Sequence, residues 1–60
     1  MMVLDYLIKY KYLNDSLIME YRTMSNNKNS AIENFLEYLK ENNINHKFIE
    51  VVSCECDCSF

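Results

Sequence analysis

One segment of this chain has the spacing of an amphipathic helix, and it limits what the rest can form. Between Ser30 and Asn43, apolar residues recur every three or four positions with charged residues between them. Ser30 followed by Glu33 fits a capping box, which predicts that the helix begins at Ser30. Asn42 or Asn43 is expected to end it in the left-handed conformation that glycine usually provides. The flanking segments alternate as strands do, so this helix is the one cover that the sequence offers to a sheet.

The first half of the chain is predicted to form a β-hairpin. Residues 2–12 and 17–24 alternate with a period of two and are rich in strand-forming residues. A two-residue turn at Asn14-Asp15 gathers the aromatic side chains on one face and sets Lys9 opposite Glu20 on the other. The other expected pairs are Tyr12 with Leu17, Tyr10 with Met19, Ile8 with Tyr21 and Tyr6 with Thr23.

A third strand is predicted over Lys47–Ser53, with an extension to Cys58 left open. A right-handed crossover from the second strand over the helix places this third strand beside the first. The predicted fold is α+β: a three-stranded antiparallel sheet of order 2-1-3 with one helix on one face. We expect a single domain over residues 1–60, in which residues 54–60 are a candidate flexible tail.

Apolar residues are predicted on both faces of this sheet. The helix is expected to cover the face with Tyr6, Ile8, Tyr10, Met19 and Tyr21. In the third strand, Ile49 and Val51 are assigned to one face, and Phe48, Val52 and the cysteines to the other. A chain this short is marginally stable alone, so we expect a homodimer, packed through the uncovered face or joined by the third strand's edge. The residues expected at the interface are Val3, Leu7, Ile18, Met24, Phe48 and Val52.

Three cysteines near the end of the sequence, Cys54, Cys56 and Cys58, are candidate metal ligands. Zinc prefers four ligands, and His46 would lie roughly 26 Å from Cys54 along an extended strand, too far to complete a site. We favour reduced cysteines that act as small apolar side chains on one strand face. A zinc site and a redox role or inter-chain disulfide are the alternatives. His46 itself is expected at the surface.

Charge and composition narrow the classes of partner. The net charge of −3 disfavours direct nucleic-acid binding, which calls for a basic face. The sequence has no apolar run long enough to span a bilayer, and its first residues lack the basic region of a signal peptide. We therefore expect a cytoplasmic protein that does not bind membranes. Because the sequence lacks a nucleophile–base pair and a phosphate-binding loop, we expect neither enzymatic activity nor a cofactor.

Glu33, Glu37 and Glu41 form a stripe along the exposed side of the predicted helix. Their spacing of about 6 Å is close to that of successive phosphates, so they are candidate partner-binding residues of a nucleic-acid mimic. A solvated helix face is the plainer interpretation. The five tyrosines are expected mostly in the core, with some as anchors at an interface.

Size, acidic composition and the strand-strand-helix-strand plan of Leu4–Met24, Ser30–Asn43 and Lys47–Ser53 resemble small proteins of bacteriophages and mobile elements. That resemblance implies an inhibitor of a host defence or nucleic-acid-processing enzyme that acts by protein contact in the host cytoplasm. The alternatives are a structural or metal-binding module built on the cysteines, and a dimer that holds a small molecule among its tyrosines.

Overall fold

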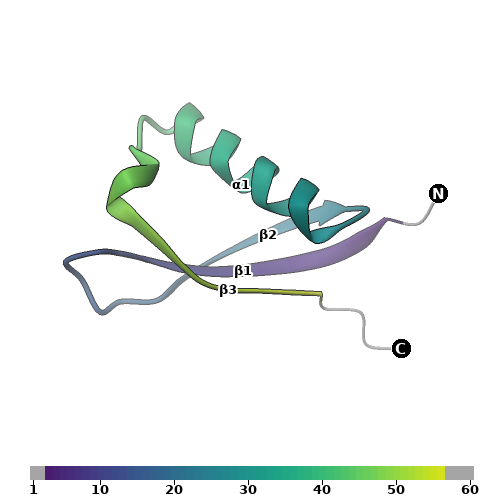
Figure 1. The fold of residues 1–60 in the computed structure, drawn as a ribbon, viewed down its shortest axis with the longest axis horizontal. Helices are drawn as coiled ribbons and strands as arrows, with labels where there is room; N and C mark the ends of the chain where they lie inside the picture. Colours follow the sequence, from purple (N-terminus) through teal and green to yellow (C-terminus); the bar gives the residue numbers. More distant parts are fainter. Residues whose placement is uncertain (1–2, 57–60) are drawn as a thin grey trace.

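A computed structural model of the protein, which describes residues 3–56, shows a twisted sheet with one helix on one face (Figure 1). The elements are β1 (Leu4–Tyr12), β2 (Met19–Ser25), α1 (Lys28–Glu41), the 3-10 turn η1 (His46–Phe48) and β3 (Ile49–Cys56). The strand order is β2-β1-β3, and both pairings are antiparallel. The predicted fold class, strand order and position of the helix are confirmed.

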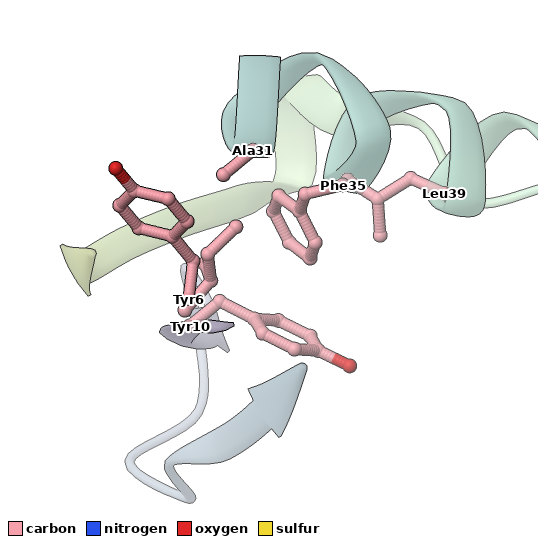
Figure 2. Close-up of a cluster of buried hydrophobic side chains, with 6 residues drawn as sticks. Tyr6, Tyr10, Ala31, Phe35 and Leu39 are labelled. Atoms are coloured by element: carbon pink, nitrogen blue, oxygen red, sulfur yellow. The ribbon is translucent and has the colours of Figure 1, made fainter. Parts of the chain in front are cut away.

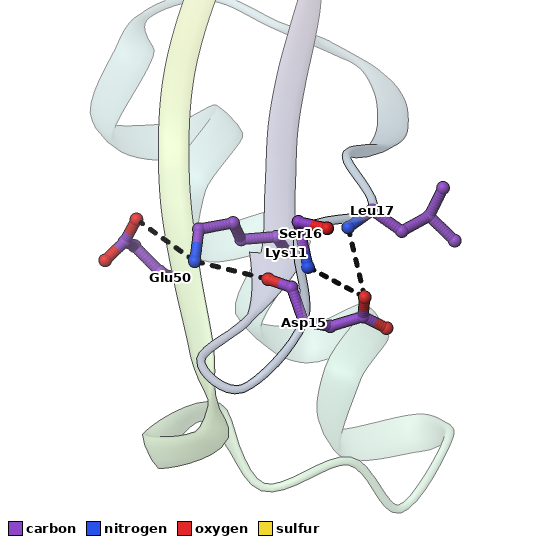
Figure 3. A network of polar contacts seen from close by, with 5 residues as sticks. All are labelled: Lys11, Asp15, Ser16, Leu17 and Glu50. Carbon is purple, nitrogen blue, oxygen red and sulfur yellow. Dashed lines mark hydrogen bonds and ion pairs between the residues drawn. The ribbon is translucent and has the colours of Figure 1, made fainter.

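The predicted register between β1 and β2 is confirmed along the ladder, where Tyr10 lies opposite Met19 and Lys9 opposite Glu20. The predicted two-residue turn is wrong. Because β2 begins at Met19, Leu17 belongs to a longer connection over residues 13–18 and has no place in the ladder opposite Tyr12. The Asp15 carboxylate shapes this connection by accepting hydrogen bonds from the backbone amides of Ser16 and Leu17 (Figure 3).

The predicted start of the helix is also wrong, since α1 begins at Lys28, two residues before Ser30. Asn27 is the N-cap, and its side-chain oxygen accepts a 2.8 Å hydrogen bond from the amide of Ser30. Ser30 therefore lies in the first turn. The predicted end is confirmed: Asn43 has φ 58°, and the amide of Ile44 donates to the carbonyl of Leu39 at 2.8 Å. This is a Schellman motif in which asparagine takes the place of glycine.

The third strand differs from prediction at its start and in its middle. Lys47 and Phe48 belong to η1, where the Asn45 side chain accepts from the amide of Lys47, so the strand begins at Ile49. A bulge then adds one residue, Val52, because Ser53 pairs with Lys9 while Val51 pairs with Tyr10.

The bulge changes which residues of β3 share a face. Residues on its two sides are out of phase by one position, so Cys54 and Cys56 lie on the α1 face together with Ile49 and Val51. The expectation that the cysteines and Val51 occupy opposite faces is therefore wrong. Cys54–Cys56 belongs to β3 and not to the expected tail, and Cys58 lies outside the described residues.

The core lies between α1 and β1 (Figure 2). The buried hydrophobic residues among those described are Tyr6, Ile8, Tyr10, Ala31, Phe35 and Leu39. The ring of Phe35 packs 4.7 Å from Tyr10 and 5.5 Å from Tyr21, measured between ring centroids. Because alternate residues of β1 face α1, the predicted buried face of the central strand is confirmed.

Candidate protein-binding surfaces

A groove of about 220 Å³ runs between α1 and β2, along one side of the helix. The residues that line it are Tyr21, Thr23, Asn34, Glu37, Tyr38 and Glu41. Its aromatic wall is the stacked pair Tyr21–Tyr38, whose ring centroids are 4.7 Å apart. The Asn34 side-chain amide donates to the Thr23 hydroxyl at 3.1 Å and joins the helix to the strand. We call this the α1–β2 groove.

Two of the three predicted partner-binding glutamates line the α1–β2 groove. Glu37 and Glu41 are exposed, and within residues 3–56 neither carboxylate has a hydrogen bond or ion pair. Glu33 is exposed on the same helix but does not line the groove. The groove thus combines two unneutralised carboxylates with the faces and edges of two tyrosines, which together suit a cationic side chain.

Tyr10 lies beneath the helix near the same groove. Burial raises the pKa of its hydroxyl, and the neighbouring hydroxyl of Tyr38, by charge repulsion and hydrogen bonding, raises that pKa further. Tyr10 therefore stays protonated at physiological pH, which suits a structural hydroxyl at the rim of the core.

The outer face of the sheet, opposite α1, carries more charge than the sequence suggested. Lys11 lies 3.8 Å from the Glu50 carboxylate, and Figure 3 shows it between Glu50 and the carbonyl of Asp15. Near the other end, Arg22 pairs with Asp5 at 3.1 Å. Two ion pairs between neighbouring strands therefore lie on the face that was expected to form an apolar dimer interface.

The six predicted interface residues are distributed over several elements. Leu7 lies in β1 on the outer face and is half-buried, and Met24 lies exposed on the same face of β2. Val3 precedes β1, Ile18 precedes β2, and Phe48 is exposed in η1. Val52 is the extra residue of the β3 bulge. Their role in a dimer stays a prediction, but they do not form one continuous face of a strand ladder.

Seven of the nine exposed large hydrophobic residues among those described fall into two groups, which the sequence alone did not separate. Leu13, Leu17, Ile18 and Phe48 lie at the hairpin-loop end, where the amide of Leu13 donates to the carbonyl of Phe48 at 3.0 Å. Leu36, Val51 and Val52 lie on α1 and β3. The loop group could have been found from the apolar pair Leu17-Ile18, had the longer connection been recognised.

The cysteines divide into two environments. Cys54 is a free thiol, half-buried against the core, as expected of a small apolar side chain. Cys56 is exposed and disulfide-bonded, so the expectation that it is a free thiol is wrong. Among residues 3–56, no three His, Cys, Asp or Glu side chains are grouped to hold a metal ion. His46 is exposed in η1, as predicted.

No protein-family model matches this chain, and no curated protein or solved structure is significantly similar to it. Within the described residues, no helix is long and apolar enough to cross a lipid bilayer. The surfaces described above are therefore the basis for any statement about function.

Proposed function

We propose that this chain is a non-enzymatic binding protein that inhibits a nucleic-acid-processing or defence enzyme of a host cell by protein contact, as small phage proteins do. The observation that carries the proposal is the α1–β2 groove, in which Glu37 and Glu41 lie beside the Tyr21–Tyr38 stack. Enzymes that act on nucleic acids have basic binding surfaces, and such a surface is complementary to this acidic side of the helix.

The contact would use two kinds of attraction at once. A lysine or arginine of the target that enters the groove meets the carboxylates and the tyrosine rings, and a cation–π contact contributes about 0.5–2 kcal/mol. Glu33, one turn before Glu37, extends the same charged line about 6 Å along the helix. Because these groups are exposed, affinity should fall as salt concentration rises.

The test is phage plating on a bacterial host that carries defence systems and expresses this chain. We expect the wild-type chain to restore plating against at least one system and to co-purify with a component of that system. The double variant Glu37→Gln, Glu41→Gln removes the charges but keeps the side-chain size, and it should lose both effects. The matched control is Glu20→Gln, Glu55→Gln, which removes two exposed charges from the outer face of the sheet.

Two results would contradict the proposal. One is a wild-type chain that changes plating on no strain and retains no component of a defence system. The other is a groove variant that inhibits as well as the wild type, which would move the contact to another surface.

We also propose that the chain acts as a homodimer. Among residues 3–56, nine large hydrophobic side chains are exposed, whereas six hydrophobic residues are buried. A 60-residue chain that leaves this much apolar surface in water gains stability when another subunit covers part of it.

The two alternative functions are weighed by direct measurements. The α1–β2 groove, at about 220 Å³, is smaller than the roughly 300–1,000 Å³ of pockets that enclose small ligands. A thermal shift on addition of a small ligand would revive that alternative. Stoichiometric zinc in the purified protein would favour the metal-binding module.

A further inference from the structure

The free edge of β3 is the surface of this fold least protected against pairing. Within residues 3–56, β3 pairs with β1 on one side and no strand lies on its other side. Its sequence from Ile49 to Cys56 contains no lysine or proline, and the protective features it does have are the charges of Glu50 and Glu55 and the bulge at Val52. Val51 and Val52, in the middle of the strand, are 40% and 48% exposed.

The helix leaves the surface beside this edge open. Asn34 and Tyr38 reach toward β2, and α1 packs more extensively on β2 than on β3. Successive helix residues are rotated by about 100°, so Asn34 and Leu36 project on opposite sides of Phe35. Since Asn34 reaches toward β2, Leu36 projects toward β3. Leu36 is 43% exposed. An apolar strip of Leu36 and Val51 thus borders the free edge.

We propose that two copies of this chain join through their β3 edges in antiparallel orientation, giving a six-stranded sheet with three strands from each copy. This inference rests on the proposed homodimer but does not depend on inhibition of an enzyme. A two-fold axis perpendicular to the sheet keeps both helices on the same face. The Leu36 and Val51 side chains of both subunits then lie on the same face of the joined sheet.

The size of the molecule is consistent with such a contact. A standard interface buries about 800 Å² on each partner, roughly a sixth of the 4546 Å² of accessible surface of one chain. The edge of an eight-residue strand and the strip beside it supply backbone hydrogen bonds and apolar area together. A second copy fits this strip because a two-fold contact brings the apolar strip of Leu36 and Val51 in one subunit next to the same strip in the other.

The bulge limits the register of the proposed pairing. Because of the bulge, residues up to Val51 and residues from Ser53 onward alternate between the two faces in opposite phase. In an antiparallel pair of β3 strands, side chains of the same face therefore lie opposite each other in only two registers. Either Val51 lies opposite the partner subunit's Val52, or the pairing is shifted from this by two residues. The shifted register sets Glu50 opposite the partner subunit's Glu55, twice over, and like charges directly opposite destabilise a pair. In the first register Glu50 faces the partner subunit's Ser53. We therefore assign the first register.

The first test compares one substitution on the edge with one on the outer face. Val52→Lys places two ammonium groups beside the two-fold axis, and we expect the dimer dissociation constant to rise by about 100-fold or more. Met24→Lys changes a residue that is 66% exposed on the outer face and should leave the dimer intact. Mass is measured by sedimentation at tens of micromolar, and circular dichroism confirms that each variant is folded.

The outcomes of this test are distinct. A dimer in the wild type and Met24→Lys, with a monomer in Val52→Lys, supports the proposal. A monomeric wild-type chain overturns the homodimer and the edge together. A dimer that survives Val52→Lys and is lost in Met24→Lys overturns the edge and assigns the dimer to the outer face, with the proposed function unaffected.

The second test fixes the register in a chain whose three native cysteines are replaced by alanine. Glu50→Cys with Ser53→Cys should give a covalent dimer on mild oxidation. The two new thiols cannot pair within one chain, since three residues of strand separate their Cα atoms by about 10 Å, beyond the roughly 7 Å limit for a disulfide. Glu50→Cys with Glu55→Cys should stay monomeric on a denaturing gel. A covalent dimer from this control pair alone would overturn the assigned register.

Discussion

The two edges of the sheet differ in how much of the fold supports them. The β2 edge lies against α1, through the Asn34–Thr23 hydrogen bond and the Tyr21–Tyr38 stack. Among residues 3–56, none covers the β3 edge to a comparable degree, and Val51 and Val52 are exposed there. One helix cannot cover three strands equally, and here it is placed over β1 and toward β2.

The two sides of the sheet therefore differ in their expected role: the β2 side stabilises the single chain, and the β3 side mediates association between chains. Side chains between α1, β1 and β2 supply the ring contacts of the core, whereas the β3 side supplies exposed apolar groups. We therefore expect substitutions on the β2 side to change the free energy of unfolding of one chain. Substitutions on the β3 side should change association between chains instead.

The largest expected effect is on the free energy of unfolding, and it compares two adjacent residues of α1: Phe35, in the core, and Leu36, on the β3 side. Phe35→Ala removes a fully buried ring that contacts Tyr10 and Tyr21, and it should lower the free energy of unfolding by about 3–5 kcal/mol. In a domain this small, such a loss leaves the chain mostly unfolded. Leu36→Ala, measured by urea titration under dilute conditions, should cost about 0.5 kcal/mol. Equal losses in the two variants would contradict the separation.

The next effect concerns the start of the helix. Asn27→Ala removes the side-chain oxygen that accepts from the amide of Ser30, and it should cost about 1 kcal/mol of stability. Ser30→Ala should cost less, because Ser30 lies in the first turn and is not the cap. Urea titration of both variants distinguishes the two positions. A larger loss in Ser30→Ala would restore the capping box that the sequence suggested.

That contrast also shows what the sequence could specify. The hairpin register followed from residues of like kind alternating along both strands, and a slip of one residue would place the aromatic side chains of one strand opposite the charged side chains of the other. The end of the helix was predictable because asparagine tolerates the left-handed conformation in place of glycine, and of the two candidates, Asn42 and Asn43, the structure assigns that conformation to Asn43. The start was predicted wrongly at Ser30, because the actual cap, Asn27, is an equally good capping residue and the choice depends on where the chain leaves β2.

The bulge at Val52 and the α1–β2 groove could not be predicted from sequence. Val51 and Val52 are identical residues, so no alternation marks the extra position, and only pairing with β1 reveals it. The groove depends on Asn34, whose side-chain amide donates to the Thr23 hydroxyl on a strand distant in sequence. Such contacts between distant segments follow from the crossing of helix and strand, which periodicity does not set.

A smaller effect is the coupling between tyrosines on the β2 side. In a double-mutant cycle, Tyr21→Leu and Tyr38→Leu should show a coupling energy of about 0.5–1.5 kcal/mol, as expected for stacked rings 4.7 Å apart. The corresponding cycle on the β3 side, Leu36→Ala with Val51→Ala, should be additive within about 0.5 kcal/mol in the monomer. Coupling of similar size on both sides would mean that the helix supports β3 as firmly as β2.

The smallest expected effect is a loss of stability at alkaline pH that is caused by the buried hydroxyl of Tyr10. Burial and the neighbouring Tyr38 raise the pKa of Tyr10 in the folded chain above its unfolded value of 10.0. The folded state therefore holds this proton more tightly than the unfolded state. The resulting stabilisation is complete below pH 10 and is lost as the pH rises through the folded pKa. Tyr10→Phe removes this group, so its urea midpoint should fall less than that of the wild type between pH 9 and pH 11. Parallel curves for the two proteins would show that the folded chain holds the Tyr10 proton no more tightly than the unfolded chain does.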